Sequence, residues 1–163
     1  MKPRQIHTAV LAALTAGVCM AGLAAPPAEA ATVITAGLSI GFNPPPGPGV
    51  LNADSLVHIE TNLYDGVGYM NNGARIELRW YGDDPGSGDT LLVGPRVFYN
   101  RAPGLYVNDD GIWLDYRLQV AASVFNEDDS LFNRTDEIYV HATFIDGDGG
   151  VIKTDSNVVS GLF

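Results

Sequence analysis

The sequence predicts an all-β fold, an antiparallel β-sandwich of about seven short strands. Apolar and polar residues alternate in short runs, as they do in strands with one buried and one solvated face. Gly, Pro, Asn and Asp separate these runs and supply the turn signals between strands. After the first thirty residues, no stretch of useful length has the apolar spacing of an amphipathic helix. This pattern is typical of two antiparallel sheets packed face to face.

The clearest alternation covers the third predicted strand, where Ile76, Leu78 and Trp80 should point into the core. Residues 146–150, Asp-Gly-Asp-Gly-Gly, should form the turn of a hairpin that joins the last two strands. The seven predicted strands are Thr32–Phe42, Ser55–Tyr64, Ala74–Tyr81, Thr90–Tyr99, Ile112–Phe125, Glu137–Ile145 and Val151–Val159.

A secretory signal peptide is predicted at residues 1–30. Lys2 and Arg4 form a short basic region, and the run 8–25 that follows is uncharged and largely apolar. Two prolines end this run, and Ala28-Glu29-Ala30 places small residues where a signal peptidase reads them. We therefore expect cleavage after Ala30, a single mature domain at 31–163, and a secreted protein.

The same N-terminal segment could instead be a membrane anchor or a lipoprotein signal. The apolar run approaches the length that spans a bilayer, but it is rich in Ala, Gly and Thr and precedes a good cleavage site. Cys19 could suggest lipidation, but Val18 stands where a lipoprotein signal needs a small residue. We therefore expect no membrane insertion after cleavage.

The predicted mature domain is strongly acidic. Loss of Lys2, Arg4 and Glu29 with the signal leaves seven basic side chains of nine and eighteen acidic side chains of nineteen. Such a surface repels phosphate backbones and anionic lipid, which argues against nucleic-acid and membrane-surface roles. The signal also removes the only cysteine, Cys19, so the mature domain cannot form a disulfide and must depend on sheet packing.

Part of the sequence resembles fibronectin type III and other immunoglobulin-like domains. The resemblance lies in the final hairpin, in segments 136–144, 146–149 and 156–159, and in Trp80 of the third strand, where such domains often bury a tryptophan. The cysteine pair of true immunoglobulin domains is missing, and Val140 replaces the tyrosine of their tyrosine corner. The resemblance implies an immunoglobulin-like sandwich, and because function in that fold lies on loops and faces, it implies no activity.

No catalytic motif is evident in the mature chain. It has two histidines, His58 and His141, and its Gly-Ser-Gly run at 86–88 lies in a predicted turn and lacks the strand and helix that flank a hydrolase serine. No cysteine or histidine spacing suits zinc. A small hydrolase that uses two carboxylates stays open, because sequence alone cannot select a pair among the acidic residues.

Acidic turns predict a candidate calcium site. An immunoglobulin-like topology would gather the turns 65–73, 100–111 and 146–150 at one end of the sandwich, and carboxylate oxygens are the ligands that Ca²⁺ prefers. Asp is also an ordinary turn residue that needs no metal. The candidate ligands are Asp65, Asp109, Asp110, Asp146 and Asp148. No other cofactor is predicted.

A candidate binding surface is predicted on one sheet face. If the strands at 74–81 and 137–145 are neighbours, Arg79, Tyr81, Tyr139 and His141 point outward together. Aromatic rings amid mixed charge suit recognition of a protein or a glycan. Trp113, outward on the other sheet, could serve similarly. Taken one at a time, these residues fit better as cross-strand pairs that stabilise a solvated face.

The sequence leaves three functions open. The first is a secreted, non-catalytic binding module for an extracellular protein or glycan, stabilised by calcium if the acidic turns hold it. The second is a secreted inhibitor or effector that acts on another protein through a rigid loop such as 44–48 or 100–104. The third is the small hydrolase. We expect the first, because the chain is one small domain without a catalytic motif.

Overall fold

The computed structural model describes residues 33–41, 49–83, 88–126 and 135–163. The predicted signal peptide, with its cleavage site after Ala30, lies outside the described residues, and so does the proline-rich loop 44–48.

Two antiparallel sheets make up the described chain. The first sheet has the strand order β1-β2-β6-β5, and the second has the order β4-β3-β7-β8 with β9 also paired to β7. The elements are β1 (Val33–Gly41), β2 (Val50–Glu60), α1 (Leu63–Asn71), β3 (Arg75–Gly82), β4 (Thr90–Tyr99), β5 (Leu105–Asn108), β6 (Gly111–Ala121), α2 (Ala122–Phe125), β7 (Asp136–Ile145), β8 (Val151–Asp155) and β9 (Val159–Gly161).

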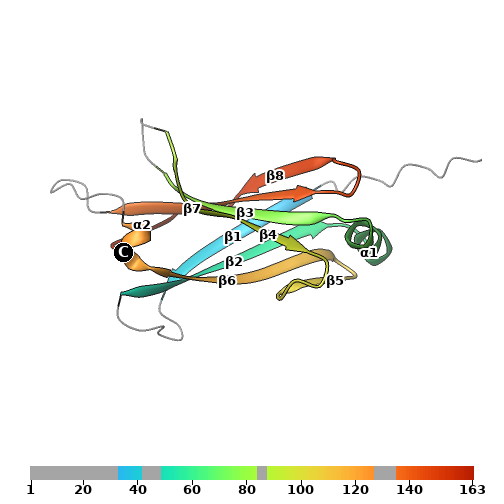
Figure 1. The fold of residues 1–163 in the computed structure, drawn as a ribbon, viewed down its shortest axis with the longest axis horizontal. Helices are drawn as coiled ribbons and strands as arrows, with labels where there is room; N and C mark the ends of the chain where they lie inside the picture. The colour runs from blue at the N-terminus through green and yellow to red at the C-terminus, as the bar shows by residue number, and fades with distance from the viewer. Residues whose placement is uncertain (1–32, 42–48, 84–87, 127–134) are drawn as a thin grey trace, which may run out of the picture.

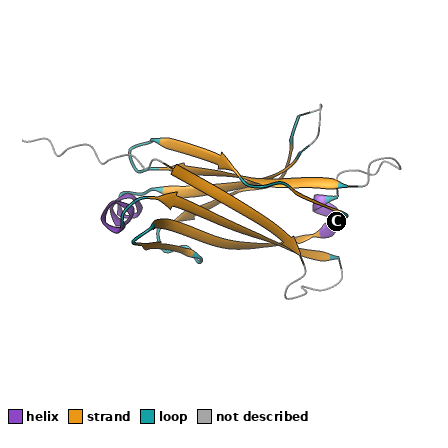
Figure 2. Cartoon of the chain, turned by 180° about the vertical axis from the view of Figure 1, so that it is seen from behind, coloured by secondary structure: helices purple, strands orange, loops and turns teal. Residues whose placement is uncertain are grey.

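The sheets lie face to face, so the predicted all-β antiparallel sandwich is confirmed (Figure 1). Seen from behind, α1 lies at one end of the sandwich and α2 lies beside the C-terminus at the other (Figure 2). With the first eight strands lettered A, B, C, C′, D, E, F and G, the sheets read ABED and C′CFG, which is the strand order of immunoglobulin-type sandwiches. This agreement concerns strand order, and membership of that family stays a prediction.

The core lies between the two sheets. Ile76, Leu78 and Trp80 of β3 are fully buried, as the alternation predicts. The Trp80 ring lies 6.0 Å from the ring of Tyr116 on β6, so it contacts the opposite sheet. The inner faces of β2, β6 and β7 contribute further fully or nearly fully buried side chains: Val57, Ile59, Ile112, Leu114, Ile138, Val140, Ala142 and Phe144.

The structure differs from the prediction between β2 and β3, where residues 63–71 form helix α1 instead of a strand end and a turn. Gly66 and Gly68 make this helix difficult to predict from the sequence, because a glycine in a helix interior lowers the stability of the helix by about 1 kcal/mol relative to alanine. Gly66 is needed for packing: a Cβ there would lie 2.7 Å from Val107 Cγ1 of β5. A glycine therefore lets the helix lie close against the sheet.

Side chains at both ends of α1 hold it in place. The Asn62 side chain caps the N-terminus by accepting a hydrogen bond of 2.9 Å from the Asp65 backbone N–H. Tyr69 and Met70 are buried, and the Tyr69 ring meets Phe144 of β7 edge-on with ring centroids 5.7 Å apart. Tertiary burial thus stabilises a helix of weak intrinsic propensity. In the described part of the chain, no helix is long and apolar enough to span a membrane.

Other predicted elements also change, and β2 begins at Val50 instead of at Ser55. The predicted turn 100–111 contains the four-residue strand β5, and the strand predicted at 112–125 ends at Ala121, where α2 begins. The strand predicted at 151–159 is divided into β8 and β9, which pair with different parts of β7. The alternation of apolar and polar residues does not predict where these strands end, because each end depends on which neighbouring strand it pairs with.

Asn157, between β8 and β9, joins the two sheets at one side of the sandwich. Its Oδ1 accepts a hydrogen bond from the Leu38 N–H, and its Nδ2 donates to the Leu38 carbonyl, both at 2.9 Å. Leu38 lies on β1, whose other edge pairs with β2. One amide side chain therefore satisfies both backbone groups that Leu38 presents at the free edge of β1.

Candidate functional site

Four of the five residues predicted to bind a ligand lie together on the outer face of sheet β4-β3-β7-β8. Arg79 of β3 is paired with His141 of β7, and Tyr81 is paired with Tyr139. The two tyrosine rings stack with centroids 5.5 Å apart and an interplanar angle of 16°. Alternation in both strands brings these side chains to one face, while Trp113 lies on β6 in the other sheet.

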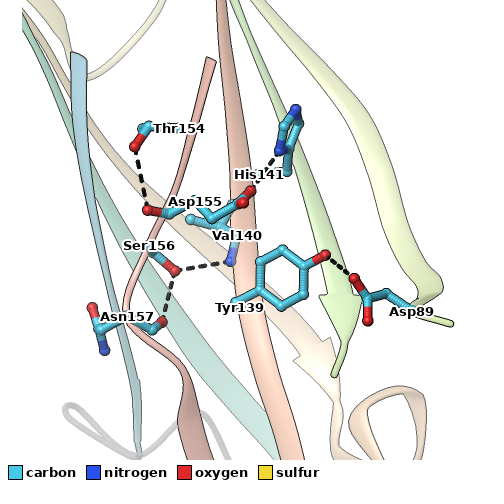
Figure 3. Close-up of polar contacts among 8 residues, drawn as sticks. All are labelled: Asp89, Tyr139, Val140, His141, Thr154, Asp155, Ser156 and Asn157. Carbon is cyan, nitrogen blue, oxygen red and sulfur yellow. Dashed lines mark hydrogen bonds and ion pairs between the residues drawn. The ribbon is translucent and has the colours of Figure 1, made fainter. Parts of the chain in front are cut away.

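Polar groups of β7 on this face have partners close by. The Tyr139 hydroxyl donates a hydrogen bond of 2.7 Å to Asp89, and His141 Nδ1 lies 2.5 Å from an oxygen of Asp155 on β8 (Figure 3). Burial, and then the hydrogen bond to Asp89, raise the pKa of Tyr139 far above the usual value for tyrosine. The hydroxyl therefore stays protonated and keeps donating at any physiological pH.

The charged residues of β3 form a second set of contacts on the same face. Glu77 accepts hydrogen bonds from Arg75 Nε at 3.1 Å and from Arg79 Nη2 at 3.0 Å, so one carboxylate pairs with two guanidinium groups. Arg79, Tyr139 and His141 of this face therefore each have a carboxylate partner within the protein. Such contacts are typical of a solvated sheet face, and ligand recognition by these residues stays a prediction.

Trp113 belongs to an aromatic row across the other sheet. Its ring stacks on His58 of β2 with centroids 4.0 Å apart, and Tyr106 of β5 lies parallel on the other side with centroids 6.5 Å apart. His58 Nε2 is 2.8 Å from the Asp110 carbonyl oxygen, which fixes one end of the row. Tyr106 forms the other end and is 49% exposed.

The five candidate calcium ligands are divided among three segments. Asp65 lies in the first turn of α1, Asp109 and Asp110 lie in the β5–β6 turn, and Asp146 and Asp148 lie in the β7–β8 turn. Among the residues that the structure describes, no three acidic, histidine or cysteine side chains form a group that could hold a metal ion.

Asp146 already has a structural role. Its Oδ1 accepts hydrogen bonds from the backbone N–H of Asp148 at 3.0 Å and of Gly150 at 2.7 Å. A side chain that closes its own turn in this way needs no metal.

Of the two loops that could suit an inhibitor, the structure describes 100–104. Backbone hydrogen bonds tie this loop to its surroundings, from Ala102 N–H to the Tyr99 carbonyl and from Leu105 N–H to the Ala102 carbonyl. The Asn100 side chain also donates to Asn71, the last residue of α1, at 3.2 Å. The loop is thus part of the α1 end of the sandwich rather than an isolated projection.

A groove of about 850 Å³ lies at this α1 end. Three apolar or aromatic side chains on its helical wall are exposed: Leu63 by 43%, Tyr64 by 87% and Val67 by 42%. Its remaining lining comes from other α1 residues, from Asn72 and from the β7–β8 turn: Asp65, Gly68, Tyr69, Asn71, Asn72, Gly147 and Asp148.

Gly147 positions the wall of the groove opposite α1. A Cβ at this residue would overlap the Asn72 carbonyl oxygen. The β7–β8 turn can therefore approach the end of α1 only because residue 147 has no side chain. The wall formed by Gly147 and Asp148 depends on this approach.

Sequence reasoning placed Asp65 and Asp148 at one end of the sandwich but missed the apolar wall beside them. The predicted strand 55–64 includes Leu63 and Tyr64, and the predicted turn 65–73 includes Val67. One local signal of the helix is present: Asn62, followed three residues later by Asp65, has the spacing of a helix N-cap and its partner.

Comparison with known proteins adds no functional assignment. No family model matches the sequence, and no curated protein is significantly similar to it. An ApaA protein structure from Bordetella pertussis is similar over 78% of this chain and 91% of that chain, with 8% identity and a TM-score of 0.43. The structural-genomics target SoR45 is similar over 80% of this chain and 86% of its own, with 6% identity and a TM-score of 0.39. Likenesses this distant carry no argument about function.

Proposed function

We propose that this chain is an exported, non-catalytic binding module that recognises another protein through the groove at the α1 end of the sandwich. The observation that carries the proposal is the exposed wall of Leu63, Tyr64 and Val67 beside a groove of about 850 Å³. Tyr64 is the most exposed large hydrophobic side chain in the described chain, at 87%. Exposed aromatic and aliphatic side chains grouped around a concavity are typical of interaction sites.

The construction of the groove supports this function. Its walls belong to a capped helix packed on the core and to a turn closed by Asp146, so the surface is formed before a ligand arrives. A preformed surface loses less conformational entropy on binding than a loop that must become ordered.

The experiment selects ligands without assuming their identity. A random peptide library displayed on phage is panned against the purified chain, and enriched peptides are then measured against Tyr64→Ala. Tyr99→Ala is the matched control, because Tyr99 is also exposed, by 56%, but lies on β4 outside the groove lining. We expect enriched peptides to lose at least tenfold in affinity on Tyr64→Ala, since truncation of an interface aromatic typically costs about 1–2 kcal/mol or more. Peptides that bind both variants equally well would contradict the proposal.

Export is a separate part of the proposal and has its own measurement. Expression of the full chain in a secreting host should place the protein in the extracellular fraction. N-terminal sequencing should begin at Ala31, because cleavage is expected after Ala30. Retention of residues 1–30 on a cell-associated protein would contradict export by a cleaved signal.

A second candidate function, glycan recognition, is favoured by the aromatic row of Tyr106, Trp113 and His58. The outer face of Tyr106 can accept a sugar ring, because its other side faces Trp113. A polysaccharide panel probed with the wild-type chain and with Tyr106→Ala tests this function. Glycan binding that Tyr106→Ala abolishes would replace the groove as the primary site.

A hydrolase, an inhibitor or a calcium-stabilised module would each also involve the α1 end, where each can be tested. The groove is lined by two carboxylates, Asp65 and Asp148, so a hydrolase should cleave glycosides or esters in a reaction that Asp148→Asn abolishes. An inhibitor should block a partner enzyme when it binds through this end. Calcium stabilisation predicts a higher melting midpoint in millimolar calcium.

A further inference from the structure

We infer that the partner of this groove is a cationic peptide segment, in which one or two apolar side chains contact α1 and neighbouring Lys or Arg side chains pair with Asp65 and Asp148. This inference rests on the proposed function and specifies the chemistry of the ligand. It follows from which side chains line the groove and from their charges.

The groove combines apolar surface with negative charge. Leu63, Tyr64 and Val67 supply the apolar wall, while Asp65 lies in the first turn of α1 and Asp148 lies in the facing turn. The described lining includes two carboxylates and no lysine or arginine. A ligand that fills this groove therefore needs apolar groups for the helix and positive charge for the two carboxylates.

The net charge of the whole chain also favours a cationic ligand. The formal net charge is −10 at pH 7, so the field around the protein attracts cationic ligands and speeds their encounter. The same charge argues against a second copy of this chain as the occupant. Two copies that meet through this end would bring Asp65 and Asp148 of each molecule together with no cation from the described lining to offset them.

The carboxylates differ in how freely they can bind a cation. Asp65 accepts a hydrogen bond of 2.7 Å from the Asn62 side-chain amide, which orients the carboxylate and leaves it further acceptor positions. Asp148 is exposed in the β7–β8 turn. We therefore expect Asp148 to make the larger contribution to a partner's affinity.

The test compares two double variants that make the same change in net charge. Asp65→Asn with Asp148→Asn neutralises the groove, whereas Asp109→Asn with Asp110→Asn neutralises the β5–β6 turn outside its lining. The probes are the peptides enriched by panning and synthetic versions in which Gln replaces every Lys and Arg. Affinity is measured by titration calorimetry at low and physiological salt.

We expect the enriched peptides to carry net positive charge and at least one apolar residue. The groove double variant should weaken them about tenfold and the turn double variant less than threefold, because each exposed ion pair that is lost weakens binding by up to about fivefold. Asp148→Asn alone should weaken binding about threefold to fivefold. The single variant keeps the test valid if loss of Asp65 at the start of α1 impairs folding, which circular dichroism would reveal.

Several outcomes would overturn the inference. Neutral or acidic peptides whose binding Tyr64→Ala abolishes would leave the proposed function intact and refute the charge requirement. Equal weakening by the two double variants would assign the attraction to net charge rather than to the groove. Absence of any peptide that depends on Tyr64 would refute the proposed function itself, so the two failures are distinguishable. A concentration-dependent dimer that Tyr64→Ala dissolves would identify a second copy as the occupant.

Discussion

The outer face of sheet β4-β3-β7-β8 and the groove at α1 contrast in how their side chains are satisfied. On the sheet face, Glu77 pairs with two arginines, and Tyr139 and His141 each have a carboxylate partner. At the groove, Tyr64 is 87% exposed, and Leu63 and Val67 are 43% and 42% exposed. The polar residues named on the sheet face have partners within the protein, whereas Tyr64 at the groove is largely exposed to solvent. A group of aromatic and charged residues in a sequence therefore does not identify a binding site. It must first be known which of these side chains already have partners within the protein.

The largest effect should be the difference in stability between truncating a buried side chain of α1 and truncating an exposed one. Tyr69→Ala should lower the free energy of unfolding by about 3 kcal/mol, because Tyr69 is buried and contacts Phe144. Tyr64→Ala, on the same helix, should change stability by less than about 0.5 kcal/mol. Urea denaturation of both variants measures the difference. Equal losses would mean that Tyr64 has a structural role and would remove the contrast.

Gly147→Ala should change the shape of the groove and leave the outer face of sheet β4-β3-β7-β8 unchanged. The added Cβ would overlap the Asn72 carbonyl oxygen, so the β7–β8 turn must move away from α1. We expect a loss of about 1–3 kcal/mol in stability together with loss of groove binding. Gly149→Ala is a poor control because of its φ of 92°, so Gly41→Ala is preferable, because a Cβ there meets nothing within 4 Å and Gly41 lies outside the groove lining. Unchanged peptide affinity in Gly147→Ala would show that the turn does not shape the site.

Glu77→Gln should lower the stability of the protein without changing the affinity of the groove for peptides. Loss of the charge on a side chain that is 14% exposed removes two ion pairs and should cost about 1–2 kcal/mol. Peptide affinity should stay within about twofold of wild type, because Glu77 is absent from the groove lining. Chemical denaturation and calorimetry on the same variant test both statements. A matching loss of affinity would show that the two regions are coupled.

Alkaline pH should produce the smallest and most specific effect. The pKa of Tyr139 is raised in the folded state, so its contribution to stability is fully present below the unfolded pKa of about 10 and is lost as pH rises above it. Tyr139→Phe should therefore flatten the decline of stability with pH in this range. Tyr99→Phe, at a ring that is 56% exposed, should leave the decline as it is in wild type. An unaltered slope in Tyr139→Phe would contradict the raised pKa.

Much of the fold could be predicted because strand alternation is a local property. Ile76, Leu78 and Trp80 alternate with polar residues and are buried, and the same rule brought Arg79 beside His141. Helix α1 was missed for a non-local reason. Gly66 weakens a helix by itself, and only its contact with Val107, forty-one residues along the chain, explains its presence. The groove depends on α1, so it could not be predicted either.

The sequence also could not show which acidic side chains already have hydrogen-bond partners within the protein. Asp89 lies outside β7, yet it accepts the Tyr139 hydrogen bond, and Asp146 uses its carboxylate to close its own turn. Both are visible in the sequence only as acidic residues near strand ends. A carboxylate that is available and one that already has partners look identical until backbone N–H groups and hydroxyls are placed around them.

The amide of Asn157 has a consequence for how copies of this protein behave at high concentration. An unpaired strand edge offers N–H and C=O groups on which a strand of another molecule can grow. At Leu38, both of these groups are already bonded to Asn157. Intermolecular strand pairing along β1 would first have to displace that side chain. At this one residue, Asn157 therefore hinders the addition of a foreign strand to the β1 edge.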